Sequence, residues 1–296
     1  MAMEKKATVR DIAAKAGVSV ATVSYVLNDK EGTKISDATR KKVLQVANLL
    51  NYSIPDKYKN VGTEKNTYSI GIIYSLKEDT PSRNTEIMYL ISLLAERFER
   101  MRFNCLLLPI ESGQEKYEPI QGLDGIIAID LDEKDFKRMS GNYYIPILCL
   151  DMMINDFLFY QIHTDMETII SSAKEVLGND FYLITDRYSN EGYQEYITSS
   201  MPKGKVLNFS DIDQKKLSSL KGKKLLVFGT YLGLIMKQYT DSDNIVIVSG
   251  AYPSHPAVDV AGSIHNDLNK KANLAMNIMM NALEKKFDIK HEYKIC

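Results

Sequence analysis

Residues 8–28 constrain the fold of this chain most strongly, because they predict two short helices joined by a very short turn. Apolar residues recur there at the spacing of one helical face: Val9, Ile12, Ala13 and Ala16. Thr8 and Asp11 have the spacing of a capping box. Gly17 suits a helix C-terminus, and Ser19 can cap the next helix. A turn of this length predicts a helix-turn-helix.

The second of these helices is predicted to turn a mostly polar face outward. Its inner residues are Val23, Val26 and Leu27. The residues at the margin or on the open side are Val20, Ala21, Thr22, Ser24, Tyr25 and Asn28. A third helix is expected after Ser36, with an inner face formed by Val43, Val46, Ala47 and Leu50. Three helices of this size can share one small core.

Positive charge is concentrated in the same N-terminal region. Residues 1–60 contain 11 Lys and Arg against 6 Asp and Glu, whereas the remaining 236 residues contain 26 against 32. A basic helical domain suits a polyanion, because binding to phosphates gains from the release of counterions. We therefore expect double-stranded DNA as a partner. The alternative is a small helical subdomain without a role in DNA binding.

The segment TVRDIAAKAGVSVATVSYVLN, residues 8–28, resembles the lactose-repressor (LacI/GalR) family of bacterial transcription regulators. The resemblance implies that the helix from Val20 to Asn28 enters the major groove, where Val20 and Ala21 select bases and Thr22 and Ser24 lie near phosphates. Tyr25 stands where the family most often has arginine, so the preferred operator should differ. The candidate DNA-binding residues are Thr8, Ser19, Val20, Ala21, Thr22, Ser24, Tyr25, Asn28, Tyr58 and Val61.

Residues 52–66 have the polar, Pro- and Gly-containing composition of a linker. The resemblance implies a hinge helix here that wedges a leucine into the minor groove. This segment has no leucine, and Tyr58 and Val61 are the candidates to replace it. A flexible tether whose lysines touch phosphates is the alternative.

From residue 68 onward, short apolar runs alternate with helical patterns, which predicts βα units and a parallel sheet. The apolar runs span residues 69–75, 105–110, 125–130, 145–151, 181–186, 224–229 and 244–250. The expected helices span residues 85–101, 166–177 and 268–285. So many strands favour two doubly wound lobes over a single unit. The family resemblance also implies two lobes of periplasmic-binding-protein type with a ligand cleft between them, here divergent and shortened.

The predicted fold class is a small all-α helix-turn-helix domain followed by an α/β region. The helical domain is expected at residues 1–52, the hinge at 53–67, and an effector-binding and dimerisation domain at 68–296. Within that domain, the first lobe is expected at about 68–162 and 263–288. The second is expected at about 163–262 and 289–296.

Polar residues beyond the carboxyl ends of strands should determine what such a cleft binds. The stretches where sugar-binding relatives place their anchors are altered here, and only Arg187, ahead of Gly192-Tyr193, matches. An ordinary monosaccharide is therefore not expected. The candidate effector-binding residues are Ser75, Arg187, Tyr193, Thr230, Tyr231 and Tyr252. Arg187 would suit a carboxylate or a phosphate, and a surface ion pair with Asp186 or Glu191 is the alternative.

The sequence offers no enzyme motif of the nucleotide-binding, hydrolase or zinc-protease kind. The four histidines are scattered and the three cysteines lack metal-ligand spacing, so neither a metal nor a cofactor is expected. No apolar run approaches about 20 residues, which predicts no membrane span. We expect a cytoplasmic bacterial repressor that acts as a homodimer. A small-molecule effector is expected to switch it, and a partner protein at the C-terminal domain is the alternative.

Overall fold

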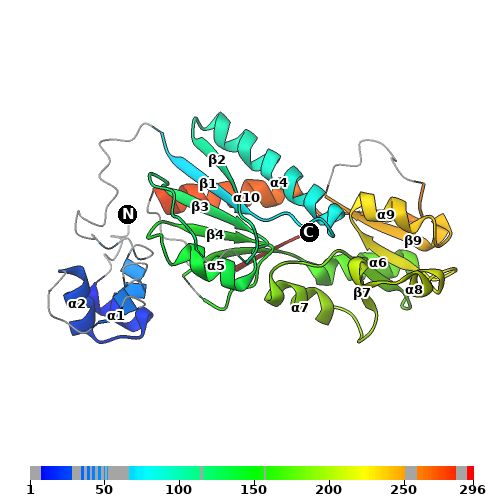
Figure 1. The fold of residues 1–296 in the computed structure, drawn as a ribbon, viewed down its shortest axis with the longest axis horizontal. Coiled ribbons are helices and arrows are strands. Elements are labelled where there is room, and N and C mark those ends of the chain that lie inside the picture. The colour runs from blue at the N-terminus through cyan, green and yellow to red at the C-terminus, as the bar shows by residue number, and fades with distance from the viewer. Residues whose placement is uncertain are drawn as a thin grey trace, which may run out of the picture.

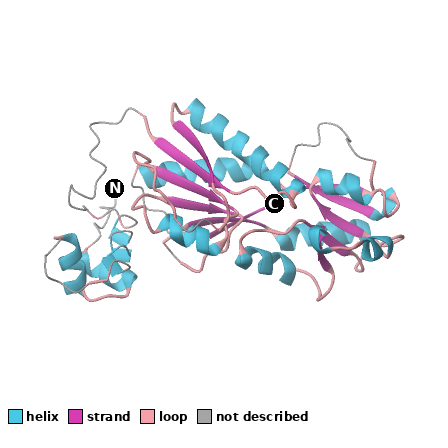
Figure 2. Cartoon of the chain, in the orientation of Figure 1, coloured by secondary structure: helices cyan, strands magenta, loops and turns pink. Residues whose placement is uncertain are grey.

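The computed structural model describes residues 8–28, 35–36, 39–40, 42–43, 46–47, 50, 52, 67–113, 116–156, 158–250, 259–284 and 292–296. These form a helical N-terminal head and two α/β lobes, each with its own sheet (Figures 1 and 2). The head contains α1 (Val9–Ala16) and α2 (Val20–Leu27). Its core is built from the apolar positions that the helical spacing predicts, and Ile12, Val23 and Val26 are completely buried.

The third helix of the head is described in part. Residues 39–40, 42–43 and 46–47 are helical, and the backbone N–H of Thr39 donates to Ser36 Oγ at 3.2 Å, as the predicted cap requires. Val43, Val46 and Ala47 are completely buried against α1 and α2. The head therefore has one shared apolar core.

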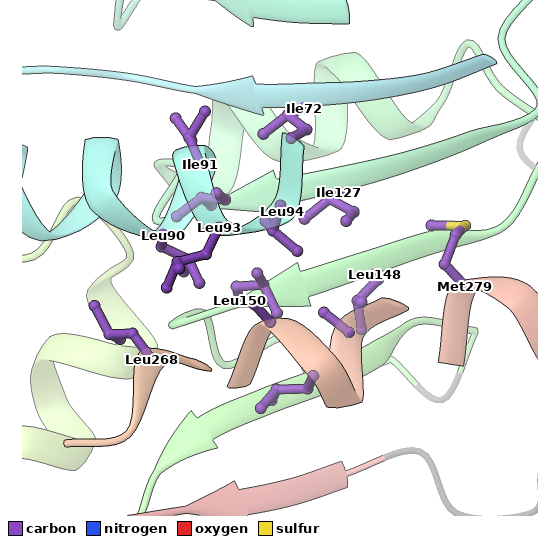
Figure 3. Packing of buried hydrophobic residues seen from close by; sticks show 14 of the residues in the cluster. Ile72, Leu90, Ile91, Leu93, Leu94, Ile127, Leu148, Leu150, Leu268 and Met279 are labelled. Carbon is purple, nitrogen blue, oxygen red and sulfur yellow. The ribbon is translucent and has the colours of Figure 1, made fainter. Parts of the chain in front are cut away.

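The first lobe is built around a six-stranded parallel sheet in the order β11-β5-β4-β3-β1-β2. Its strands are β1 (Ser69–Tyr74), β2 (Asn104–Pro109), β3 (Gly125–Ile129), β4 (Ile147–Leu150), β5 (Tyr160–Thr164) and β11 (Glu292–Ile295). The helices α4 (Pro81–Arg100) and α10 (Leu268–Leu283) cover one face, and α5 (Glu133–Ser140) covers the other. Figure 3 shows leucines of α4 meeting Ile127, Leu148 and Leu150 of the sheet.

The second lobe has a five-stranded parallel sheet in the order β10-β9-β8-β6-β7. Its strands are β6 (Tyr182–Thr185), β7 (Val206–Asn208), β8 (Leu225–Phe228), β9 (Ile245–Ser249) and β10 (Gly262–His265). Its helices are α6 (Met166–Leu177), α7 (Glu191–Ser199), α8 (Gln214–Ser218) and α9 (Thr230–Met236), with short 3-10 turns at Phe209–Asp211 and Ser242–Asn244. The two doubly wound lobes expected from the sequence are present.

The segment after the first strand differs from the expectation. The helix predicted to begin at residue 85 begins at Pro81, because proline is well suited to the first turn of a helix. As a result Ser82 and Arg83 lie on a helix and are buried, at the end of α4 that faces the second lobe (Figure 1).

Four strands were not predicted: β5, β7, β10 and β11. Their sequences contain polar or charged residues, as in YQIHT and EYKI, and three of them lie at sheet edges, where strands need little apolar sequence. Their pairing also changes the lobe limits. The expected second lobe included residues 289–296, but β11 pairs with β5 in the first sheet. Conversely, β10 lies in the second sheet, although residues 263–265 were expected in the first lobe.

Candidate functional site

Both ends of α2 are capped by side chains of the motif itself. Ser19 Oγ accepts a hydrogen bond from the backbone N–H of Thr22 at 3.0 Å. At the other end, Asn28 Nδ2 donates to the carbonyl of Ser24 at 2.9 Å. Gly17, which ends α1, has a φ of +66°, in the left-handed region that glycine adopts without strain. The predicted caps and turn are therefore confirmed.

The first helix is fixed in the same way. The Thr8 backbone N–H donates to Asp11 Oδ2 at 2.8 Å, and the Asp11 N–H donates to Thr8 Oγ1 at 3.3 Å, which completes the capping box. Thr8 and Ser19 thus have a structural role in the head. Their contact with DNA stays a prediction.

The outer face of α2 carries the residues that the sequence places there. Val20 is 47% exposed and Tyr25 is 38% exposed, although apolar and aromatic side chains of this size are more often covered. Ala21 and Asn28 are exposed, and Thr22 and Ser24 are half-buried. A helix presented in this way leaves one face available to a groove. Tyr58 and Val61, the candidates in the hinge, lie outside the described residues.

The described residues that were expected to bind an effector each have different surroundings. Arg187 is half exposed, and its Nη2 pairs with Asp211 Oδ2 at 2.6 Å, rather than with Asp186 or Glu191. Tyr193 is buried in the core of the second lobe, where its hydroxyl accepts from the Thr164 N–H at 3.3 Å. Thr230 bonds Ser249 at the start of α9, next to the exposed Tyr231. Ser75 is buried after β1, and Tyr252 lies outside the described residues.

A different group of side chains occupies the junction of the two lobes. We call it the interlobe network: Arg83, Glu86, Asp130, Asp151, Asp186 and Lys271. Arg83 lies at its centre and is 6% exposed. Its Nε donates to Asp130 Oδ2 at 3.0 Å and its Nη2 donates to Asp151 Oδ2 at 3.0 Å. Its guanidinium also lies over the ring of Tyr188 from the second lobe, 4.7 Å from the ring centre.

Lys271 of α10 extends the network into the first lobe. It is completely buried, and its Nζ donates to Asp151 Oδ1 at 2.6 Å and to Thr164 Oγ1 at 3.1 Å. Burial alone would raise the pKa of Asp151, but Lys271 and Arg83 outweigh it and lower that pKa to about 2. Asp151 is therefore ionised at neutral pH and compensated by two cations.

The other carboxyl groups of the network are less completely compensated. Burial raises the pKa of Glu86, Asp130 and Asp186 above the ordinary values, although Arg83 opposes the change in each case. Against the effect of burial, Asp130, Asp151 and Glu86 raise the pKa of Arg83 well above its ordinary value. The network is thus a buried ionic group whose acids outnumber its bases.

The interlobe network was not predicted from the sequence, although the sequence contains a signal for part of it. Asp130, Asp151 and Asp186 each directly follow a buried strand, namely β3, β4 and β6. The carboxyl ends of parallel strands are where α/β folds place their functional groups. Asp130 and Asp151 also have positive φ values of 48° and 52°, which aspartate tolerates better than most residues. Nothing local in the sequence shows that Arg83 reaches these carboxylates.

The described residues offer neither a metal site nor a membrane-spanning helix. Within them, no group of three or more His, Cys, Asp or Glu side chains is placed to hold a metal ion. In the same parts of the chain, no helix is long and apolar enough to cross a membrane. Cys149 is buried and the other two cysteines are partly buried, and all three are free thiols.

Comparison with known proteins identifies the head. Residues 8–55 match the lacI family of bacterial regulatory proteins. The head is therefore a helix-turn-helix domain of the lacI family. Among relatives of the chain, the transcriptional repressor PurR of Mannheimia succiniciproducens is 28% identical over 153 residues, which cover 49% of this chain and 43% of that protein. The repressor MelR of Bacillus subtilis is 31% identical over 140 residues, which cover 45% of this chain and 39% of that protein.

The chain thus matches less than half the length of either relative, and both relatives are transcription regulators. Among solved structures, this chain is similar to the lac repressor dimer bound to operator and the anti-inducer ONPF. The TM-score is 0.51 and the identity 16%, with 98% of this chain and 96% of that chain covered. A putative regulator from Staphylococcus saprophyticus gives a TM-score of 0.52 at 13% identity, with 77% of this chain and 94% of that chain covered. The lac repressor structure, which covers nearly the whole chain, shows the fold: a helix-turn-helix head followed by two α/β lobes.

Proposed function

We propose that this lacI-family protein is a sequence-specific DNA-binding transcription regulator that acts as a repressor in the bacterial cytoplasm. The observation that carries the proposal is the outer face of α2, because the helix is capped at both ends and still leaves Val20 and Tyr25 exposed. The basic composition of residues 1–60 supports the same assignment. In this proposal α2 reads base edges in the major groove and the helix ends contact phosphates.

We also propose that two copies bind a near-palindromic operator as a homodimer. Exposed apolar side chains on two helices that contact each other support this arrangement: Met88 on α4, and Tyr231 and Leu234 on α9. Large exposed apolar side chains on neighbouring helices are consistent with an interface. In this arrangement the head is residues 1–52, the hinge 53–67, and the dimerising region 68–296.

A small molecule that acts between the lobes is the proposed signal. Such a molecule must compete with the interlobe network, because Arg83 already bonds carboxylates at the ends of β3 and β4. The same observation is consistent with a second candidate function, in which the C-terminal region binds a partner protein. A thermal-shift panel of sugars, sugar phosphates and nucleosides separates the two: a saturable shift supports the small molecule, and no shift together with a captured partner supports the protein. No catalytic role is proposed.

The experiment that tests DNA binding is titration of duplex DNA into the purified full chain at several salt concentrations. Two heads that each neutralise at least two phosphates predict a slope of log K against log[salt] of about −4 or steeper. Sedimentation of the free protein and of the complex should give two chains per duplex. Binding that is absent, or that does not weaken as salt rises, would contradict the proposal.

A further inference from the structure

The N-terminus of α4 is capped from the other lobe. Its own N-cap residue, Thr80, makes no side-chain capping bond. Instead, the backbone N–H of Arg83 donates to Asp186 Oδ2 at 2.9 Å, and Asp186 follows β6 in the second lobe. Asp186 is only 3% exposed. A carboxylate at the N-terminus of a 20-residue helix satisfies a free N–H group and the helix dipole together.

The second lobe is bonded in the same way by a carboxylate of the first lobe. Asp130, at the end of β3, accepts from the backbone N–H groups of Ser189 at 2.9 Å and Asn190 at 3.1 Å. These two N–H groups lie at the start of α7 in the second lobe. The same carboxylate binds Arg83 Nε through its other oxygen. One aspartate from each lobe therefore bonds backbone of the other, and Arg83 lies between them.

The two lobes also approach each other closely enough to require glycine. Ser82 Oγ donates to the carbonyl of Phe228 at 3.3 Å, and a Cβ added to Gly229 would lie 1.9 Å from that Oγ. A Cβ added to Gly192 would lie 2.9 Å from the carbonyl oxygen of Met153. Packing this close indicates a specific, well-packed contact between the two lobes.

We propose that Arg83, with Asp130 and Asp186, forms a built-in bridge that joins the lobes as a bound ligand would, so that closure needs no small molecule. A ligand closes a two-lobed protein only because it bonds both lobes in the closed state. Here the guanidinium of Arg83 bonds Asp130 and Asp151 of the first lobe and stacks on Tyr188 of the second. The step that an incoming signal controls is then opening.

The proposal also assigns a chemical class to the site. Truncation of Arg83 would leave two carboxylates and an aromatic face around a space shaped for a planar cation. That space should accept a free guanidinium compound, since guanidinium pairs with two carboxylates and stacks on aromatic rings. A neutral molecule of the same shape gains neither the charge pairing nor the cation–π contact.

The test compares the full chain with its Arg83→Ala variant, both unfolded in urea and refolded to remove bound small molecules. Hydrogen exchange of the peptide 186–193 reports the Ser189 and Asn190 N–H groups, and small-angle scattering reports the separation of the lobes. The wild-type protein should be protected and compact without additives. In Arg83→Ala, exchange should quicken at least tenfold and the radius of gyration should rise. Ethylguanidinium should reverse both changes with half-saturation at roughly 1–10 mM.

Urea at the same concentrations is the matched neutral probe and should restore nothing. Arg100→Ala is the matched arginine control, and its exchange should equal the wild type because Arg100 is exposed and pairs with exposed Glu96 on α4, outside the reporting peptide. The proposal is overturned if refolded wild type is unprotected in peptide 186–193, if Arg83→Ala stays as protected as wild type, or if urea rescues as well as ethylguanidinium. Should Arg83→Ala not fold, Asp186→Ala replaces it, with faster exchange at the Arg83 N–H expected and unchanged exchange overturning the proposal. None of these readouts involves DNA, so this test and the test of DNA binding can fail separately.

Discussion

Replacement of Lys271 with methionine should destabilise the protein strongly, because the buried carboxylate of Asp151 then keeps only one of its two cationic partners, Arg83. Lys271 Nζ lies 2.6 Å from Asp151 Oδ1, and both side chains are buried. Methionine keeps most of the length of lysine and makes no ion pair. The variant therefore removes the charge with little change in packing.

The magnitude follows from the electrostatics of Asp151. Lys271 and Arg83 hold the pKa of Asp151 at about 2, against an ordinary value near 4. A difference of about two pKa units corresponds to ~3 kcal/mol, and the loss of one partner from a buried pair costs about 3–5 kcal/mol. Because Arg83 remains, we expect the lower end, ~3 kcal/mol. For lobes of this size that predicts a fall in Tm of roughly 6–12 °C.

The assay is urea unfolding of the wild type, Lys271→Met and Arg187→Met. Arg187 is the matched control, since its pair with Asp211 is exposed and should contribute at most about 1 kcal/mol. The double variant Lys271→Met with Asp151→Asn should recover part of the loss, because it removes the uncompensated charge as well. Equal effects of the Lys271 and Arg187 substitutions, or a double variant as unstable as the sum of its parts, would refute the reasoning.

Three further predictions follow from single contacts. The folded-state pKa of Asp151 is lowered, so the stabilisation by its carboxylate is complete above about pH 4 and is lost as the pH falls toward 2. The difference in Tm between the wild type and Asp151→Asn should therefore become smaller from pH 5 to pH 3. A difference that does not change with pH would contradict this. Gly17→Ala should lower the stability of the head by about 1 kcal/mol, because Gly17 has a φ of +66°. Limited proteolysis would detect this loss as faster cleavage within residues 8–28. Tyr193→Phe should cost about 1–3 kcal/mol in urea unfolding, since it leaves the buried Thr164 N–H without its acceptor at 3.3 Å; an unchanged midpoint would show that this hydrogen bond contributes nothing.

The head could be predicted from the sequence because its determinants are local. Each cap joins residues three or four positions apart, as in the Thr8–Asp11 box, and one helical period defines the core face. The buried strands were predicted for a similar reason, since both of their faces are covered and their sequences are continuously apolar. Polar edge strands such as β11 give no such signal, because their pairing depends on a neighbour far away in the sequence.

The interlobe network could not be predicted for the same physical reason. Arg83 and Lys271 both bond Asp151, although they are separated by most of the α/β region. Each aspartate at a strand end was visible in the sequence, but its partner was fixed only by the way the lobes pack. For Arg187, the alternative of a surface ion pair named the wrong partner, because the side chain bonds Asp211 and not Asp186 or Glu191; its contact with an effector stays a prediction.

Selection of bound fragments from a random pool of duplex DNA tests most directly the claim that α2 reads DNA. The wild-type chain should recover a motif with two-fold symmetry, formed by two half-sites. The Tyr25→Arg variant should recover the same symmetry with a changed base, because arginine can pair bidentately with guanine and tyrosine offers one hydroxyl. Tyr25 is 38% exposed on α2, so the substitution should leave the fold of the head unchanged. Recovery of no motif, or of an identical motif with both proteins, would contradict the account.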